Sequence, residues 1–412
     1  MSFPQYPKYK PSGVEWLGDV PEHWTSIRYK NIFFEKIRKN GAYLPAGAIS
    51  FGTVVFKSEE SFNEDTKATY QEVLQGEFLI NPINLNYDLK SLRTALSAID
   101  TCVSPAYIVL QAQIEIDATY LKYQLFLFDI RHMKTLGAGV RQTITFADIG
   151  SCFTQLPPLA EQTQIAGFLD RETGKIDELV AEQRRLIALL KEKRQAVISH
   201  AVTKGLNPNA PTKPSNIQWL GNIPEHWEVR RMKFLCDIQT GDKDTENAVD
   251  DGQYPFFVRS QTVERIDSMA FNCEAVLTAG DGAGVGKVFH YYEGPFDFHQ
   301  RVYMMNRFRK ITGKFLFHFL RENFFKVVLE GGAKSTVDSL RRPMFANFPI
   351  CVPPLAEQCE IIERIESDAA NVDALTAEAE RAIELLQERR TALISSAVTG
   401  KIDVRDADAS AA

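Results

Sequence analysis

Apolar residues recur at alternating steps of four and three in two long stretches of the chain. The first stretch runs from Leu159 to about His200 without a proline, and the second repeats it 196 residues later. Such spacing predicts two amphipathic helices of the coiled-coil type. The side chains expected at the interface are Ile165, Leu169, Ile176, Leu179, Leu186, Leu190 and Val197 in the first helix, and Ile365, Val372, Leu375, Leu386 and Leu393 in the second.

These two helices need partners. Each has about 40 residues and is roughly 60 Å long at 1.5 Å per residue. One apolar stripe does not stabilise such a helix alone, so the simplest arrangement is an antiparallel pair with one domain near each end. The alternative is that each helix packs on its own domain.

Three sequence motifs occur twice in the same order. Residues 14–24 (VEWLGDVPEHW) match 217–227 (IQWLGNIPEHW), here called the opening motifs. LPPLAEQ at 156–162 matches VPPLAEQ at 352–358, and AVISHAVTK at 196–204 matches ALISSAVTG at 392–400. A repeat of half the chain predicts two similar structural units and a pseudo-two-fold molecule. Duplex DNA is the commonest two-fold target for such a molecule.

The regions between the helices carry most of the aromatic residues and glycines. Short β-rich runs such as 106–110 (AYIVL) and 302–305 (VYMM) predict mixed α/β domains with strand cores. The expected fold class is α+β, two mixed α/β domains separated by a long antiparallel two-helix coiled coil. Its parts are a first domain at 1–155, helix and linker at 156–212, a second domain at 213–350, and helix with C-terminal tail at 351–412.

Composition is that of an ordinary globular protein, with 44% hydrophobic and 24% charged residues. No apolar run reaches membrane-spanning length, no signal peptide is evident, and the six scattered cysteines form no metal-binding pair, so a cytoplasmic protein without a metal is expected. The net charge is −6, and residues 351–412 hold 13 acidic but only 6 basic residues. The rest is near neutral, which permits local basic faces.

A glycine-rich segment, GDGAGVGK at 280–287, is the most enzyme-like stretch. Position 288 is Val where a Walker loop requires Ser or Thr, so a nucleotide-binding loop is not predicted. Asp281, Gly282 and Lys287 are instead candidates to approach a phosphate or base edge. A tight turn with a solvated lysine is the alternative.

Other polar clusters precede strands and helices in both copies. Glutamine and arginine suit adenine and guanine edges, and glycines followed by cations and hydroxyls suit phosphates. The remaining DNA-binding candidates are His299, Gln300 and Arg301 in one cluster, Lys90, Arg93 and Thr94 in another, and Arg141, Gln142 and Thr143 with the matching Lys334, Ser335 and Thr336 before the helices. Solvated charge alone is the alternative for each.

The four tryptophans all lie in the opening motifs, at Trp16, Trp24, Trp219 and Trp227. Matched placement favours a structural clasp over base stacking, and His23 and His226 are interpreted as framework. No adenine-methylation tetrapeptide, zinc-protease motif or serine-hydrolase motif occurs. A non-enzymatic role is therefore expected, although an active site around Asp281, Lys287 and His299 stays open.

Taken together, these features resemble the specificity subunit of type I restriction–modification systems. The resemblance rests on the opening motifs, the two P-P-L-A-E-Q segments, the 281–287 turn and His299-Gln300-Arg301, in order along the whole chain. It implies two target-recognition domains, each reading one half of a split asymmetric DNA site, with the coiled coil setting the gap. The first domain departs from the pattern because it lacks the D-G-x-x-G-K turn.

The same resemblance implies the partners and cofactors. Two methyltransferase subunits would bind S-adenosylmethionine, and restriction subunits with motor activity would use ATP and Mg²⁺, whereas this chain itself would hold no cofactor. The location implied is the cytoplasm of a bacterium or archaeon, without a membrane partner. The competing hypothesis is a two-headed protein–protein scaffold on a coiled-coil strut.

Overall fold

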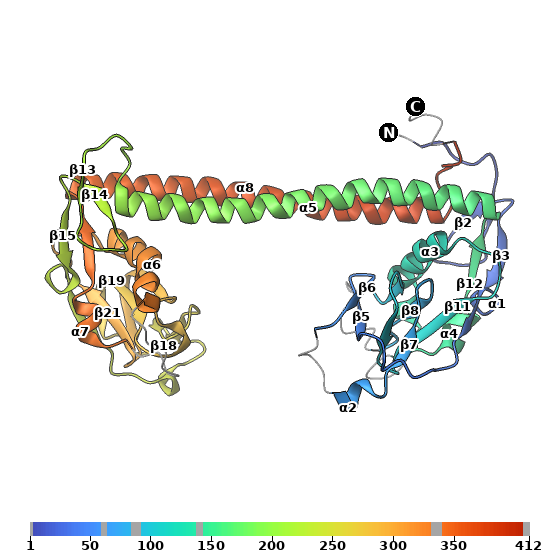
Figure 1. Cartoon of the computed structure of the whole chain (residues 1–412), viewed down its shortest axis with the longest axis horizontal. Helices are drawn as coiled ribbons and strands as arrows, with labels where there is room; N and C mark the ends of the chain where they lie inside the picture. Colours follow the sequence, from blue (N-terminus) through green and yellow to red (C-terminus); the bar gives the residue numbers. More distant parts are fainter. Residues whose placement is uncertain (1–2, 59–63, 84–91, 137–142, 331–339, 407–412) are drawn as a thin grey trace. The chain divides into compact units, whose positions relative to one another are not determined.

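The computed structural model describes residues 3–58, 64–83, 92–136, 143–330 and 340–406, without the side chains of 64 and 326–330. The chain divides into two compact units (Figure 1). Unit 1 is Met1–Glu182 with Ala382–Ala412, and unit 2 is Gln183–Arg381. Each unit contains one β-rich domain, here the first and the second domain, together with part of each long helix.

Short strands and a few helices build the first domain. Its elements are β1 Tyr9–Pro11, β2 Asp19–Pro21, β3 Thr25–Arg28, α1 Tyr29–Ile32, β4 Phe33–Glu35, β5 Gly47–Ser50, β6 Thr53–Phe56, α2 Glu64–Lys67, β7 Gln71–Val73, β8 Phe78–Ile80, β9 Thr94–Leu96, β10 Thr101–Val103, β11 Ile108–Ala112, α3 Ala118–Arg131, η2 Met133–Thr135, α4 Phe146–Ser151 and β12 Phe153–Leu156.

The second domain repeats much of this order with longer strands. Its elements are β13 Thr212–Pro214, β14 Asn222–Pro224, β15 Glu228–Arg231, η3 Met232–Phe234, β16 Asp237–Thr240, η4 Thr245–Asn247, β17 Tyr254–Phe257, β18 Glu264–Ile266, β19 Phe271–Ala279, η5 Gly282–Gly284, β20 Phe289–Phe298, β21 Val302–Asn306, α6 Gly313–Glu330, α7 Arg342–Ala346 and β22 Pro349–Val352.

The two domains share one sheet topology. The first has a four-stranded sheet in the order β4-β11-β8-β9, and the second has β16-β21-β19-β20 extended by β17 and β18. In each sheet these four strands pair antiparallel. The connection β8–β9 (residues 81–93) therefore corresponds to β19–β20 (residues 280–288), the glycine-rich segment.

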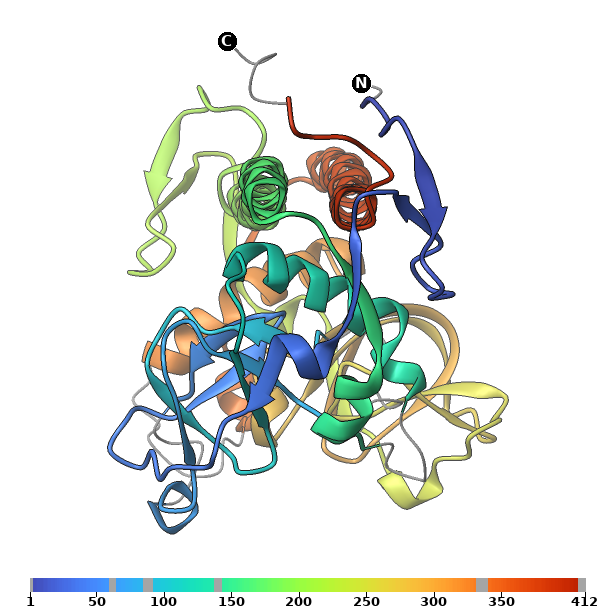
Figure 2. The same ribbon diagram turned by 90° about the vertical axis from the view of Figure 1, so that its right-hand side faces the viewer.

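Two long helices, α5 Leu159–Lys204 and α8 Leu355–Val398, pack together in both units (Figure 2). In unit 1, Arg390 Nε lies 3.0 Å from Asp177 Oδ1, and in unit 2, Arg194 Nη1 lies 3.4 Å from Asp373 Oδ1. The start of each helix thus pairs with the end of the other, which makes the pair antiparallel. The predicted fold class, two β-rich domains with paired long helices, is confirmed.

The inward-facing stripe of the helices differs from the predicted one at three positions. Leu179, Leu186 and Leu375 are 46%, 43% and 49% exposed. Val180 is buried and Ile187 half-buried, so the inward positions lie one residue later. The other predicted interface residues, namely Ile165, Leu169, Ile176, Leu190, Val197, Ile365, Val372, Leu386 and Leu393, are buried or half-buried.

Packing against the first domain accounts for the corrected phase. Ile165 and Leu169 belong to the core of that domain, and the next inward residue is Thr173, again four positions later. Thr173 Oγ1 lies 3.0 Å from the hydroxyl of Tyr123 on α3, which fixes the rotation of α5 at this turn. Because residues 179 and 180 are both apolar, the sequence alone is compatible with either of them facing the other helix.

A buried carboxylate joins the start of α5 to the first opening motif. Glu161 accepts hydrogen bonds from Tyr6 Oη (2.7 Å) and Trp24 Nε1 (2.9 Å), and it lies 2.7 Å from His23 Nε2. Burial and the adjacent Glu161 carboxylate raise the pKa of Tyr6 above its usual range. The Glu161 side chain is 6% exposed, so its charge is compensated almost wholly by these partners.

The same junction recurs in unit 2. Glu357 Oε2 lies 2.7 Å from His226 Nε2 and accepts a hydrogen bond from Trp227 Nε1 at 3.1 Å. The following glutamine has a matching role in both copies: Gln162 bonds Asp117 N and Pro157 O, while Gln358 bonds Thr312 N and Pro353 O. The opening motif and the P-P-L-A-E-Q motif therefore contact each other in both units, which accounts for the duplication of both motifs.

We expect Glu161→Gln to destabilise unit 1 by about 2–3 kcal/mol, because the buried Tyr6 and Trp24 donors would lose a charged acceptor and an amide nitrogen would replace the carboxylate oxygen that faces His23. Glu357→Gln should cost less, about 1 kcal/mol, since Glu357 contacts His226 and Trp227 without a counterpart of Tyr6, and its side chain is 24% exposed. Urea unfolding followed by tryptophan fluorescence measures both, because every tryptophan lies in an opening motif. Glu22→Gln, at an exposed ion pair with Lys8, is the control. Equal stability of Glu161→Gln and wild type would contradict the junction's role.

A second buried carboxylate, Asp129 on α3, accepts a 2.5 Å hydrogen bond from the backbone N–H of Arg93. Burial raises its pKa from 3.8 to about 6, partly offset by that hydrogen bond. Because the folded-state pKa is the higher one, stability from this group is present below pH 4 and is lost as the pH rises through about 6.

Asp129→Asn should remove this pH dependence and keep an acceptor for Arg93. At pH 7.5 we expect the variant to be more stable than wild type by up to about 3 kcal/mol, and at pH 4 nearly equal to it. Denaturant midpoints at the two pH values test the expectation. A variant less stable than wild type at pH 7.5 would show that the charged form is favoured in the fold.

Candidate nucleic-acid interface

Close backbone packing shapes the glycine-rich segment between β19 and β20. A Cβ at Gly280 would come within 2.9 Å of Arg301 O, and one at Gly284 within 2.6 Å of Arg259 O. Gly282 has φ +73°, in the left-handed region that favours glycine. The glycines thus let this turn lie directly on the segments that carry Arg259 and Arg301.

Asp281 holds these two arginines on its two carboxylate oxygens. Arg259 Nη1 lies 3.0 Å from Oδ1, and Arg301 Nη1 lies 2.9 Å from Oδ2. Their side chains are 41% and 59% exposed, whereas Asp281 is 19% exposed. The result is a pair of partly solvent-facing guanidinium groups with a fixed spacing. Arg259 was not predicted from the sequence, although it follows β17 as Arg301 precedes β21.

His299 and Gln300 are anchored by a second aspartate. His299 Nδ1 accepts a hydrogen bond from Arg301 N at 2.9 Å, and Nε2 lies 3.5 Å from Asp244 Oδ1. The ring is only 2% exposed, so the prediction that His299 contacts DNA is corrected: this residue orients the backbone before β21. Gln300 is exposed and donates from Nε2 to Asp244 Oδ2 at 2.5 Å, and the Thr245 and Gln300 hydrogen bonds lower the pKa of Asp244.

Lys287 is an exposed cation at the end of the glycine-rich segment. Its side chain is exposed, and its Nζ lies 5.8 Å from the centre of the Phe325 ring on α6. Contact with an aromatic face orients the lysine without neutralising it. Of the predicted residues, the structure therefore pairs Asp281 with Arg301, while Gln300 contacts Asp244 and Lys287 contacts Phe325.

In the first domain the corresponding connection ends at Arg93 and Thr94. The backbone of Arg93 is fixed on both sides, because its N–H donates to Asp129 and its carbonyl accepts from Asn81 N at 2.8 Å. Thr94 is 5% exposed within β9, so the prediction of a DNA contact by its side chain is corrected. Burial follows from its pairing with Ile80 of β8.

Thr143 and six further candidates complete the predicted set. Thr143 is exposed just before α4. The others lie outside the described residues: Lys90, Arg141, Gln142, Lys334, Ser335 and Thr336. Their contact with DNA stays a prediction.

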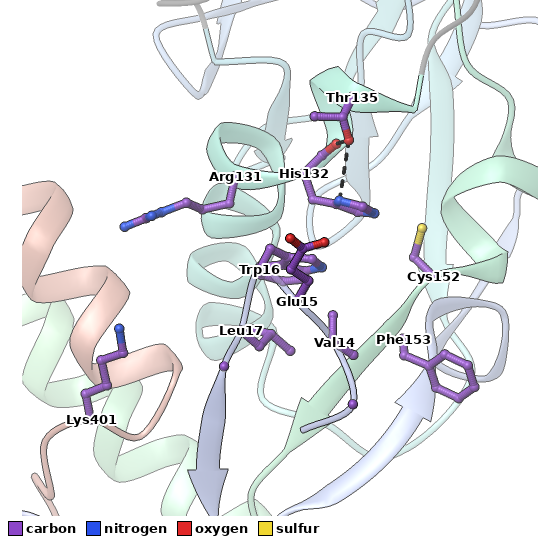
Figure 3. A pocket seen from close by; sticks show the side chains of 12 residues that line it. Val14, Glu15, Trp16, Leu17, Arg131, His132, Thr135, Cys152, Phe153 and Lys401 are labelled. Atoms are coloured by element: carbon purple, nitrogen blue, oxygen red, sulfur yellow. Dashed lines mark hydrogen bonds between the residues drawn. The ribbon is translucent and has the colours of Figure 1, made fainter. Parts of the chain in front are cut away.

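The tryptophans form part of the framework. Trp24 and Trp227 are 1% and 0% exposed, which excludes base stacking by these two. Trp16 stacks on His132 with ring centres 5.9 Å apart, beside an open pocket of about 720 Å³ that its opening motif lines (Figure 3). Trp219 stacks on Phe348 in the second copy.

Within the residues that the structure describes, no group of three histidine, cysteine or acidic side chains is arranged to hold a metal ion. Over the same residues, no helix has the length and apolar character of a membrane span.

Comparison with known proteins gives a consistent result. The family model described as the type I restriction modification DNA specificity domain matches residues 224–385. The specificity subunit of the Escherichia coli type I restriction enzyme EcoDI is 32% identical over 182 residues, which cover 44% of this chain and 40% of that subunit. The MjaVIII specificity subunit of Methanocaldococcus jannaschii is 25% identical over 415 residues, covering 94% and 95%.

Solved structures show the same fold. One from work on complex assembly and conformational transition of the type I R-M system has a TM-score of 0.66 at 16% identity, covering 92% of this chain and 98% of that chain. The HsdS subunit from Thermoanaerobacter tengcongensis has a TM-score of 0.50 at 15% identity, covering 93% and 98%. Residues 224–385 thus match the DNA specificity domain of type I restriction–modification systems, and nearly the whole chain is similar in sequence and fold to specificity subunits of such systems.

Proposed function

We propose that this chain recognises a two-part asymmetric DNA sequence for a type I restriction–modification complex. The domain at 1–155 reads one half-site, and the domain at 213–350 reads the other. The helices in 156–212 and 351–412 set the gap between them. The observation that carries the proposal is the arginine pair on Asp281, in a domain whose framework is repeated in the other half of the chain.

Arginine supports base recognition because its planar guanidinium donates two parallel hydrogen bonds to guanine O6 and N7. In solution such a side chain samples many rotamers, and ordering it on binding costs free energy. Arg259 and Arg301 are already ordered by Asp281, at 3.0 and 2.9 Å. Gln300 suits adenine, and Lys287 suits a phosphate.

Charge supports a requirement for partner subunits. With a net charge of −6, the chain has little general attraction for phosphates, so other subunits must supply much of the DNA affinity. Two methyltransferase subunits that bring S-adenosylmethionine fit this need, and restriction subunits with ATP and Mg²⁺ would complete the complex. The location we propose is the cytoplasm of a bacterium or archaeon, since such organisms hold the relatives.

Duplicated exposed leucines support two equivalent partners. Leu179 and Leu375, 196 residues apart, are 46% and 49% exposed. Leu189 and Leu385, with the same separation, are 52% and 65% exposed. Large exposed apolar residues that recur on a helix pair are typical of subunit contacts. Each unit has one leucine of each pair, namely Leu179 and Leu385 in unit 1 and Leu189 and Leu375 in unit 2.

The direct test is a binding selection with random-sequence duplexes, using the chain with and without its methyltransferase subunits. The proposal expects retention of a two-part sequence, with stronger binding when those subunits are present. Indifference to DNA sequence in both arms, together with stable binding of other proteins, would favour the scaffold hypothesis instead.

Asp281→Asn should release at least one arginine of the pair. We expect discrimination at one or two positions of the second half-site to fall about tenfold or more, because a bidentate arginine contact contributes about 1–3 kcal/mol of base discrimination. The first half-site should be unchanged. Competition binding with single-base variants of both half-sites measures this.

Asp237→Asn provides a matched control, since Asp237 also bridges two arginines, Arg309 at 2.6 Å and Arg307 at 3.5 Å, away from the turn. This control should retain wild-type base preference. Equal loss of discrimination in both variants would show a general charge effect rather than reading by the Asp281 pair.

Removing one heptad from each helix tests the role of the helix pair. Residues 183–189 and 378–384 lie opposite each other in the register set by the Asp177–Arg390 and Arg194–Asp373 pairs. Deleting both keeps the apolar stripe in phase and shortens the pair by about 10.5 Å, or roughly three base pairs.

The double deletion should retain both half-site sequences and accept a shorter gap in the same binding selection. As a control, a variant in which the sequence of 183–189 is replaced by that of 190–196 keeps the helix length. It should accept the same DNA gap as wild type. Changed half-sites with an unchanged gap would contradict the spacing role.

A further inference from the structure

A hairpin of the first domain presents an aromatic side chain at its tip. Strands β5 and β6 pair from Gly47↔Phe56 to Ser50↔Thr53, and Phe51-Gly52 forms the two-residue loop. Both loop residues have positive φ, +47° and +77°, as in a type I′ turn. Such turns favour Asn-Gly or Asp-Gly, and a bulky residue at the first position is strained.

Folding buries little of the Phe51 side chain, so hydrophobic burial does not offset this strain. Its side chain is 91% exposed, the highest exposure among the large hydrophobic residues of the described chain. The hairpin itself is well anchored, because Val54 and Ile49 pack with Leu79 and Val109 in a core cluster. A strained, exposed aromatic on a fixed support indicates a contact outside the chain.

The position of the tip favours DNA as that contact. Gly52 lies against the side chain of Leu92, the residue that precedes Arg93 at the end of the β8–β9 connection. This connection corresponds to the second-domain turn that carries Asp281 and Lys287. An aromatic beside a cation is the combination that stacks on bases while neutralising phosphate.

We propose that Phe51 is an apolar wedge that inserts at a base step of the half-site read by the first domain and unstacks it. The inference rests on the proposed DNA recognition and adds to it a means of reading deformability. Proteins that insert phenylalanine between base pairs select steps that unstack at low cost. Sequence preference at this step would then arise without a hydrogen bond to either base.

Phe51→Asn separates folding from binding, because it creates the favoured Asn-Gly turn. We expect the full-length variant to unfold about 2–4 °C higher than wild type, as relief of strain stabilises the hairpin. In complex with the methyltransferase subunits, its affinity for the selected duplex should fall about 5- to 150-fold, the range for loss of one base–aromatic stack. Phe51→Trp should retain most of the affinity.

Fluorescence of 2-aminopurine, placed in turn at each adenine of the two half-sites, gives the specific readout. With the wild-type complex, one position in the first half-site should brighten through unstacking, and this signal should be lost with Phe51→Asn. Phe56→Asn is the matched control: Phe56 is 55% exposed on the same hairpin but at the end away from the tip, and its variant should keep the signal.

The outcomes are separable. A Phe51→Asn complex with wild-type affinity and signal would overturn the wedge while leaving DNA recognition intact. Weaker binding of methyltransferase subunits without DNA would instead identify Phe51 as a protein contact and also overturn the wedge. Failure of the wild-type complex to select any DNA sequence would overturn the proposed function and the wedge with it.

Discussion

The whole arrangement depends on a carboxylate at the start of each long helix. Glu161 and Glu357 each hold the histidine and tryptophan of an opening motif. The end of the opposite helix reaches the same place: Gly400 lies against Trp24, and Gly205 against Trp227. Each junction therefore requires both helices and one opening motif, so neither helix is stabilised without the domains it connects.

The two junctions explain why only part of the sequence is duplicated. The junction motifs must match one another, and seven of eleven residues in the opening motif and six of seven in LPPLAEQ/VPPLAEQ are identical between the copies. The connections between the sheet strands bear no such constraint, and they differ between the copies. In the second domain, Asp281 orders two arginines on a compact glycine-rich turn. In the first, the corresponding connection ends at Arg93, whose backbone is fixed by the buried Asp129. A common frame with different surfaces suits a protein that reads two different half-sites.

The sequence revealed the frame more fully than the surface. Three duplicated motifs and a four–three apolar spacing were enough to predict two domains and a pair of long helices. The phase of that pair could not be predicted at Leu179 and Val180, because both residues are apolar and only packing through Thr173 and Tyr123 distinguishes them.

The surface contacts were harder to predict from the sequence, because the residues involved come from different strands and meet only in the folded chain. His299 stands in a polar cluster in the sequence, yet Asp244 and the Arg301 backbone bury it. Arg259 lies 22 residues before Asp281, and nothing in the sequence indicates that a parallel pairing of β17 with β20 brings them together. Phe51 likewise became noticeable only through its backbone conformation and exposure.

The central claim is that the first and the second domain, which share one duplicated framework, each recognise their own part of a DNA sequence. Sequencing of methylated adenines in the genome of a host that expresses this chain with its methyltransferase subunits tests it most directly. The account predicts one two-part motif with a constant unspecified gap, which disappears when the chain is removed. A single uninterrupted motif, or methylation that does not depend on this chain, would contradict the account.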